Sequence, residues 1–480
     1  MSPLSSRTLL SRRNFIRLFG GAAVTTAGAA LIPQYLRKTL LPVEIAQAQA
    51  VEPPPDLYFA GTDGWIYLPP DPPIGFYHPD SYAPAPFTTY IFGFHNITGL
   101  NTTQVGSQKN KAQHNAPLFW VDEYDETILD PNTNKPKEFR LQLTNLGFTQ
   151  RPDLVDSHTI HWHGFRNVIP FYDGEPNTSV SVPVGRNFTY VYRPRDPGTY
   201  MYHCHVEDVE HVHMGMTGLV FVRPKQNWHG NSAGAPVARY NGGPATAPLG
   251  YAYDDGVALG DPLSTAYDRE FAMFLSEVWA EAHWDDAHIQ LPEWTDYHAD
   301  FALLNGRVYP DTLAPNGSIN PFNVAHDANG DIIPPAGRPE LQYQPLSALI
   351  TCQPGERVLL RFANLGFKEA AMTLAGIPMK VIGLDATLMR SRDGTDTSYT
   401  TNTISISAGE SFDVIFTAPA FSGGSGSSGN GYDSYTLYNR SYARSDNLAG
   451  ADGFGDQRTE VRVYPSGTLA AQQYPNDWGM

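Results

Sequence analysis

The segment that most constrains this 480-residue chain is Gly198–Met216, with the sequence GTYMYHCHVEDVEHVHMGM. It concentrates four histidines, one of the two cysteines of the chain and several methionines. About forty residues upstream lies a second histidine-rich segment, His158–Gly164, with the sequence HTIHWHG. Thiolate, imidazole and thioether donors so close together are the combination that copper prefers, so the two segments predict a copper protein.

The two segments divide their donors between two faces if each is an extended strand. Side chains two residues apart share a face of a strand. His161 and His163 then point one way, as do His203 and His205. His158 and Cys204 point the other way.

Two ligand sets follow from this division. His158 and Cys204, completed by the nearby His211 and Met216, are the two-histidine, thiolate and methionine set of a blue-copper electron-transfer centre. The other set suits copper ions that bind oxygen and consists of His161, His163, His203 and His205. Cys204 is bonded in sequence to a histidine on each side, so only a few covalent bonds separate the two predicted centres.

Other interpretations of the histidines are possible when each motif is taken alone. A single His-x-His pair also occurs on exposed strands without a metal, and a His/Cys cluster in general suggests zinc. Structural zinc sites usually use paired cysteines, and this chain has no Cys-x-x-Cys. The combined pattern therefore favours copper.

The two motifs resemble those of the multicopper oxidases, the family of laccases and ascorbate oxidases. His158–Gly164 is similar to the family motif His-x-x-His-x-His-Gly, and Gly198–His205 to Gly-Thr-x-x-Tyr-His-Cys-His. His211–Met216 resembles the ascorbate-oxidase version of His-x-x-x-Gly-Met, which implies that His213 and Met214 are packing residues and not ligands. The resemblance implies an all-β chain of two cupredoxin-like Greek-key domains, each a β-sandwich or barrel.

Asp173 is a further candidate that depends on this resemblance. Asp173-Gly174-Glu-Pro and Pro183-Val-Gly-Arg resemble the stretch that precedes the second histidine motif in the family. The resemblance implies a catalytic carboxylate near the oxygen-binding coppers that manages protons. The alternative is a plain Asp-Gly turn.

Composition also indicates an all-β protein, since glycine (43) and proline (40) are abundant and charged residues make up only 17%. The predicted organisation is a signal segment, a copper-binding domain, a Gly/Ala/Pro-rich linker, a copper-free domain and a C-terminal tail. The predicted bounds are residues 1–50, 51–225, 226–262, 263–465 and 466–480.

The chain departs from the family pattern in three ways. Val206–Glu210 is about two residues longer than the usual gap before the next histidine. The motifs of one copper domain are present, where the family normally has two, and no histidine follows His326. A three-copper cluster in this family uses eight imidazoles, so we expect a homo-oligomer to complete the site, with two N-terminal domains facing each other across a twofold axis.

The first fifty residues predict export. Ser11-Arg12-Arg13-Asn14-Phe15 is a twin-arginine pattern, and a short apolar stretch and small residues suited to cleavage follow it. Removal of this segment, with six basic and one acidic side chain, changes the net charge from −17 to −22. An acidic surface argues against nucleic acid as a partner and fits a periplasmic or secreted prokaryotic protein. A retained membrane anchor is the alternative.

The sequence therefore predicts a copper-dependent oxidase. One-electron oxidation of a small-molecule or metal-ion donor at the blue copper would be coupled to oxygen reduction at shared coppers. One alternative is a nitrite-reductase-like copper enzyme, although the histidine-free second domain counts against it. The other is a non-catalytic blue-copper electron carrier.

Overall fold

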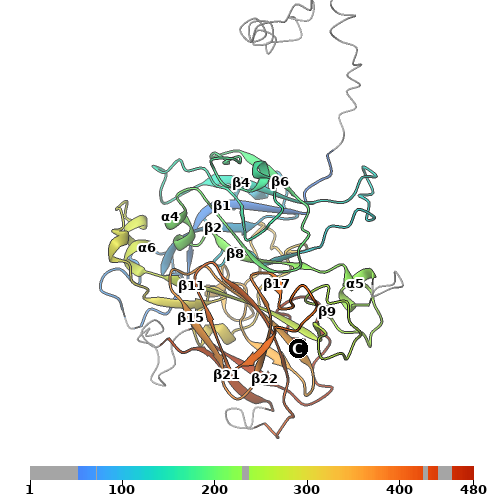
Figure 1. The fold of residues 1–480 in the computed structure, drawn as a ribbon. Helices are drawn as coiled ribbons and strands as arrows, with labels where there is room; N and C mark the ends of the chain where they lie inside the picture. The colour runs from blue at the N-terminus through green and yellow to red at the C-terminus, as the bar shows by residue number, and fades with distance from the viewer. Residues whose placement is uncertain (1–51, 72, 230–236, 425–430, 442–456, 480) are drawn as a thin grey trace, which may run out of the picture. The chain divides into compact units, whose positions relative to one another are not determined.

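The structure is a computed structural model that describes residues 52–71, 73–229, 237–424, 431–441 and 457–479. The predicted signal segment, residues 1–50, lies outside these ranges. Residues 54–480 cluster into one unit by their contacts, and this unit is described below. Strands dominate it, which confirms the predicted all-β fold (Figure 1).

The N-terminal half contains two four-stranded sheets, in the orders β2-β1-β4-β6 and β3-β8-β7-β5. β4 shows why the two sheets pack face to face. Its buried residues alternate with more exposed ones, so one face of its sheet is covered. One core cluster takes Leu57 and Leu141 from the first sheet and Phe119 and Tyr202 from the second, so the sheets form a sandwich. The strands are β1 (Leu57–Ile66), β2 (Thr89–Asn96), β3 (Phe119–Asp122), β4 (Phe139–Gly147), β5 (His161–His163), β6 (Asn187–Tyr192), β7 (Gly198–His203) and β8 (Thr217–Arg223).

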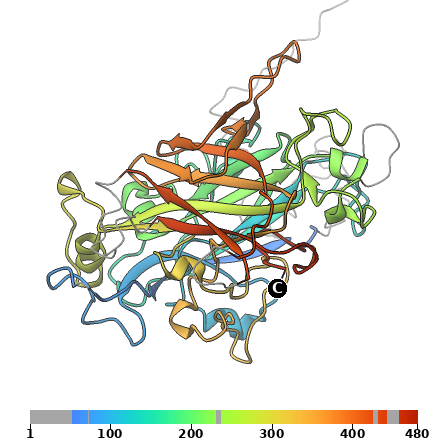
Figure 2. The same cartoon turned by 90° about the horizontal axis from the view of Figure 1, so that it is seen from below.

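The C-terminal half is a second sandwich, of a seven-stranded and a five-stranded sheet (Figure 2). Its core joins Phe271 and Leu360 of the larger sheet to Met372 and Leu437 of the smaller one. The larger sheet contains β11 (Arg269–Val278), β12 (Phe301–Leu304), β14 (Arg357–Asn364), β16 (Met379–Leu384), β17 (Thr387–Leu388), β18 (Tyr399–Thr401) and β20 (Ser411–Thr417). The smaller sheet contains β13 (Ile350–Cys352), β15 (Ala370–Leu374), β19 (Thr403–Ile406), β21 (Asp433–Asn439) and β22 (Arg458–Val463).

Short elements connect the strands. β9 (Gly250–Tyr251) and β10 (Ala266–Tyr267) pair with each other between the two halves. The α-helices are α3 (Thr102–Gly106), α4 (Asp208–Met214), α5 (Gln226–His229) and α6 (Ala280–Ala287). The 3-10 turns are η2 (Pro170–Tyr172), η3 (Arg239–Asn241), η4 (Trp294–Asp296), η5 (Asp311–Leu313) and η6 (Pro339–Leu341). Among the described residues, no helix combines the length and the apolar character that crossing a membrane requires.

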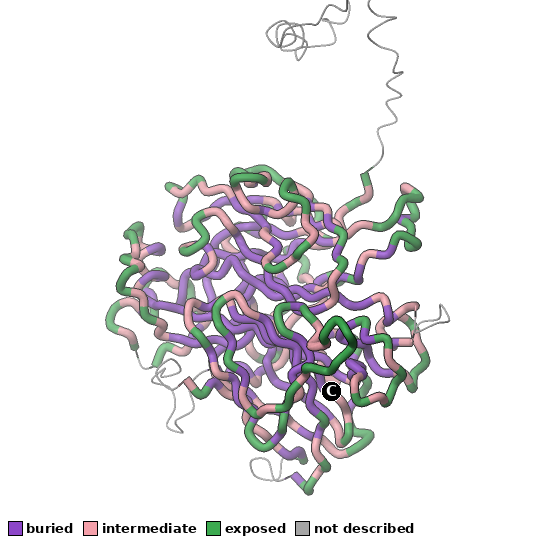
Figure 3. The backbone as a smooth tube through the Cα atoms, in the orientation of Figure 1, coloured by how far each residue is buried: buried purple, intermediate pink, exposed green. Residues whose placement is uncertain are grey.

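The two halves meet through buried residues, which are purple in Figure 3. Met201 and Phe221 pack against Ala272 and Phe274 across this junction. A polar network lies beside them and ties β7 to the C-terminal half. Thr199 Oγ1 donates to Asp413 Oδ1 over 2.5 Å, and Arg361 Nε donates to Glu270 Oε1 over 2.6 Å. β7 leads directly into the cysteine motif, so the junction fixes the strand that carries it.

Candidate metal centres

The structure brings His158, Cys204 and His211 together. One ligand atom from each lies within 4.8 Å of the others, and all three residues are buried. Cys204 Sγ lies 3.3 Å from His211 Nδ1. Met216 is fully buried, its N–H donates to the carbonyl of His211, and its own carbonyl accepts from Cys204 N–H. We refer to His158, Cys204, His211 and Met216 as the Cys204 group.

Local structure explains how the Cys204 group forms. β7 ends at His203, so Cys204 lies where the chain leaves the sheet. The longer segment before His211 then folds into α4, a helix of seven residues whose N-cap, Glu207, has a left-handed backbone (φ 47°). The helix brings His211 back toward Cys204. His158 is held by reciprocal backbone hydrogen bonds with Val182.

The electrostatics of this group suit a metal ion. Burial alone disfavours the Cys204 thiolate, but the adjacent His211 and the N–H of Thr159, 3.5 Å from Sγ, hold the pKa of the thiol below its usual value. Burial keeps the pKa of His158 well below its usual value, so this imidazole is neutral. Both ring nitrogens of His158 are buried without a hydrogen-bond partner. A neutral imidazole with a buried lone pair facing a thiolate is a ready ligand pair.

His161, His163, His203 and His205 form a second cluster, which we call the four-histidine group. His161 on β5 pairs directly opposite His203 on β7. The ring centroid of His161 lies 5.1 Å from that of His203 and 4.9 Å from that of His205. Ligand atoms of His161, His163 and His203 lie within 4.8 Å of one another. The structure therefore separates the donors into the two sets that strand alternation predicts.

Hydrogen bonds assign the tautomers in the four-histidine group, since a backbone carbonyl only accepts. His161 Nδ1 donates to the carbonyl of Asp173 (2.9 Å), and His203 Nδ1 donates to that of Cys204 (2.8 Å). His163 Nε2 donates to the carbonyl of Gly409 (3.2 Å), in the C-terminal half. The remaining nitrogen of each ring then carries a lone pair.

Two of these lone pairs face each other. His163 Nδ1 and His203 Nε2 are 3.3 Å apart. Burial lowers the pKa of both imidazoles, that of His203 to about 3, so neither is a cation at neutral pH. Two acceptors at this distance repel each other unless a cation lies beside them. The donor set therefore fits a metal ion.

Asp173 lies beside the four-histidine group at the end of η2. Its Oδ1 is 3.5 Å from His161 Nδ1, and its backbone carbonyl accepts the His161 proton. Burial raises the pKa of its carboxyl to about 6. Gly174 has a left-handed backbone (φ 74°), and a Cβ there would lie 2.0 Å from the carbonyl oxygen of Ile160. The Asp-Gly turn thus packs tightly against the histidine strand and holds Asp173 next to His161.

Sequence reasoning missed several contributors to these groups. Gly409 is 246 residues from His163, and nothing in its local sequence indicates the contact. The sequence places Thr159 next to His158 but does not indicate that its Oγ1 accepts the N–H of His205 (2.9 Å). Asp156 and Glu207 were also missed, and both carboxylates come within 4.8 Å of His211.

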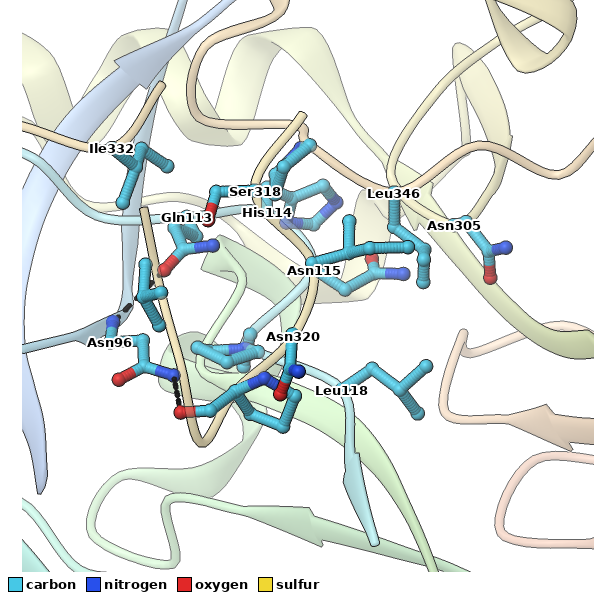
Figure 4. Close-up of a pocket in the computed structure, with 16 residues that line it drawn as sticks. Asn96, Gln113, His114, Asn115, Leu118, Asn305, Ser318, Asn320, Ile332 and Leu346 are labelled. Atoms are coloured by element: carbon cyan, nitrogen blue, oxygen red, sulfur yellow. Dashed lines mark hydrogen bonds between the residues drawn. The ribbon is translucent and has the colours of Figure 1, made fainter. Parts of the chain in front are cut away.

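Other histidines lie outside both groups. His78, His95 and His114 are each at most 1% exposed. His213 and Met214 are buried as well, and Trp279 N–H donates to His213 Nε2 (3.1 Å). His114 lines a pocket with amide side chains such as Gln113, Asn115 and Asn305 (Figure 4). This pocket shares no lining residue with the Cys204 group or the four-histidine group.

Two regions of the chain match family models described as multicopper oxidase, over residues 147–227 and 274–424. No curated protein matches the sequence. Solved structures with a similar arrangement include the multicopper oxidase mgLAC, with 20% identity over 87% of this chain and 88% of that one and a TM-score of 0.49. A blue copper oxidase from Nitrosomonas europaea is 17% identical over 87% and 88% of the two chains, with a TM-score of 0.48. A copper nitrite reductase from the same organism is 13% identical over 88% and 96%, with a TM-score of 0.45.

Proposed function

We propose that this chain, which matches multicopper oxidase family models over residues 147–227 and 274–424, couples one-electron oxidation of a donor at the Cys204 group to oxygen reduction at the four-histidine group. The observation that carries the proposal is the pair of facing lone pairs on His163 and His203, 3.3 Å apart beside a separate thiolate site. Copper ions held by the two groups would supply one-electron redox chemistry and oxygen binding.

Each residue has a proposed part in this function. His158, Cys204, His211 and Met216 hold a blue copper, and the four histidines hold oxygen-binding coppers. The carbonyls of Asp173, Cys204 and Gly409 fix three imidazoles with one lone pair directed into the group. Asp173 exchanges protons beside His161, for which a pKa of about 6 is suited near neutral pH.

The route between the groups is the chain itself. Cys204 directs its side chain into one group, while its two peptide-bonded neighbours belong to the other. His203 Nδ1 also donates to the carbonyl of Cys204. An electron that reaches the thiolate therefore has a short covalent path, and a hydrogen-bonded shortcut, to the imidazoles.

We infer that a second copy of the chain completes the four-histidine group. The described residues bring four imidazoles together, none of them from the C-terminal half. His203 is buried, whereas His161, His163 and His205 stay partly exposed. An open, histidine-lined face of this kind suits a homo-oligomer in which two N-terminal domains supply four imidazoles each.

We also propose export by the twin-arginine route to a periplasmic or extracellular location, on the basis of Arg12 and Arg13.

The copper-to-chain ratio of the purified, copper-loaded protein tests the function. One blue copper and half of a shared three-copper cluster give about 2.5 copper ions per chain. About two would favour a nitrite-reductase-like enzyme, and about one an electron carrier.

A variant pair adds a second test. His161→Ala should abolish oxygen consumption and leave the blue absorption of the Cys204 group. The matched control, His298→Ala, alters an exposed histidine away from both groups and should keep both signals. Oxygen consumption that survives His161→Ala would refute the proposed role of the four-histidine group.

A further inference from the structure

A cavity of about 320 Å³ lies against β3, the edge strand of its sheet. Burial alternates along this strand, because Phe119 and Val121 point into the core. Trp120 is only partly buried, Asp122 is exposed, and both line the cavity, as expected for side chains two residues apart on a strand. Sites for small molecules typically enclose about 300–1,000 Å³, so the space is large enough for a ligand. We call it the Asp122 cavity.

The walls of the Asp122 cavity are aromatic. The rings that line it are those of Trp120, Tyr124, Phe139 and Phe322. Phe322 comes from the C-terminal half, is 39% exposed, and meets Trp120 edge to face with the ring centroids 5.5 Å apart. These walls suit a ligand with an apolar body.

The same rings also attract cations, since the face of an aromatic ring is negative. The guanidinium of Arg193 lies 5.2 Å from the ring centroid of Tyr124. That of Arg223 lies 5.0 Å from the centroid of Trp120. In the described part of the chain, no basic side chain covers Phe139 or Phe322. These two rings therefore remain for a cation that enters from solvent.

Asp122 is the carboxylate of the cavity that lacks a partner. The other carboxylates in the lining are Asp56, Glu123, Asp125 and Glu138. Their basic partners are Lys137 for Asp56 (3.3 Å), Lys225 for Glu123 (3.1 Å), His229 for Asp125 and Arg193 for Glu138 (2.7 Å). Among the described residues, none forms an ion pair with Asp122.

Arg223 shows why Asp122 stays unpaired. The two residues are opposite each other in the parallel pairing of β3 with β8. The guanidinium of Arg223 lies instead 3.5 Å from Glu270 and 3.5 Å from the ring centroid of Tyr240. The charge of Asp122 is thus left beside the aromatic walls without a counter-ion from the described chain.

We propose that the Asp122 cavity binds a small monovalent organic cation of the alkylammonium class. The rings pack against the alkyl groups, and Asp122 neutralises the positive charge. A divalent metal ion needs several oxygen ligands at once, whereas the cavity offers one free carboxylate. The cavity shares no residue with the Cys204 group or the four-histidine group, so the inference does not depend on the proposed function.

Isothermal titration calorimetry of the purified, copper-loaded protein with choline tests the site. The control ligand is 3,3-dimethylbutan-1-ol, which has the shape of choline with a carbon atom in place of the charged nitrogen. Asp122→Asn removes the charge of the side chain and keeps its shape, and Phe322→Leu removes an exposed ring and keeps an apolar side chain. The matched control is Glu126→Gln, because Glu126 is an exposed carboxylate of the same stretch that does not line the cavity. Thermal unfolding checks that each variant is folded.

We expect choline to bind saturably and roughly tenfold more tightly than the neutral alcohol. Asp122→Asn should weaken choline binding at least about fivefold, and Phe322→Leu about two- to fivefold. Glu126→Gln should bind choline as the wild type does. If Asp122→Asn does not fold, Phe322→Leu and the neutral alcohol decide the result.

Three outcomes would overturn the inference. The first is the absence of saturable choline binding, or equal binding of choline and the neutral alcohol. The second is equal weakening by Asp122→Asn and Glu126→Gln, because the attraction would then come from the general negative charge of the surface. The third is displacement of choline by Ca(II) at the same concentration, which would assign the cavity to a metal ion.

Discussion

Gly409 provides a test of the four-histidine group from a position far away in the sequence. Its backbone is left-handed (φ 83°), and its carbonyl accepts the proton of His163 Nε2 over 3.2 Å. A Cβ at this position would lie 3.3 Å from His163 Nε2 and 3.4 Å from Cε1. Gly409→Ala therefore adds backbone strain and also presses on the imidazole.

Gly355 separates these two effects. It has nearly the same backbone (φ 82°) in the same half of the chain, but a Cβ there would meet nothing within 4 Å. Alanine in the left-handed region costs about 1–2 kcal/mol at either position, so both variants should lose that much stability. Only Gly409→Ala moves the partner that orients His163. Loss of such a partner typically weakens metal affinity by roughly 10–100-fold.

The assay is copper retention during dialysis against a graded chelator, followed together with the blue absorption. We expect Gly409→Ala to release copper from the four-histidine group at a lower chelator concentration and to lose oxygen consumption, with the blue band preserved. Gly355→Ala should retain copper as the wild type does. Equal retention in the two variants would show that the Gly409 carbonyl does not orient a metal-binding His163.

Three further substitutions test separate parts of the structure. Cys204→Ser should remove the blue absorption and about one copper per chain, measured by metal analysis, while copper at the four-histidine group remains. Asp413→Asn should lower the free energy of unfolding, measured in denaturant titrations, by roughly 3 kcal/mol, because Arg361 stays buried after losing one of its carboxylate partners. A much smaller loss would mean that the junction network contributes little to stability. Burial, together with Asp254, raises the pKa of Glu123 to about 8. The folded state therefore holds this proton more tightly than the unfolded state, so Glu123 adds to the free energy of unfolding at low pH, and this contribution is lost as the pH rises from about 4.5 to about 8. Glu123→Gln should therefore flatten the pH dependence of unfolding over that window, and an unchanged slope would contradict the assignment.

The local sequence was sufficient to predict those features of the two sites that depend only on local backbone geometry. Alternation along a strand separates His161 and His163 from Trp162, which is buried in the N-terminal core. The same rule divides His203 from Cys204, and it holds because backbone geometry sets the side-chain direction regardless of what packs nearby. The all-β class was predicted separately, from the abundance of glycine and proline and the low share of charged residues.

The tautomers and the surroundings of the donors required the folded chain. The carbonyl that orients His163 comes from Gly409, and whether a loop 246 residues away covers this ring depends on how the two halves pack. His211 likewise meets Asp156 only because α4 folds back, with Glu207 in the left-handed region, a conformation that residue type alone does not indicate. The sequence by itself therefore determined which residues are donors and how they divide. The tertiary structure decided which lone pairs face each other, which rings stay partly exposed and which carboxylates surround His211, because these depend on distances between segments that no local rule sets.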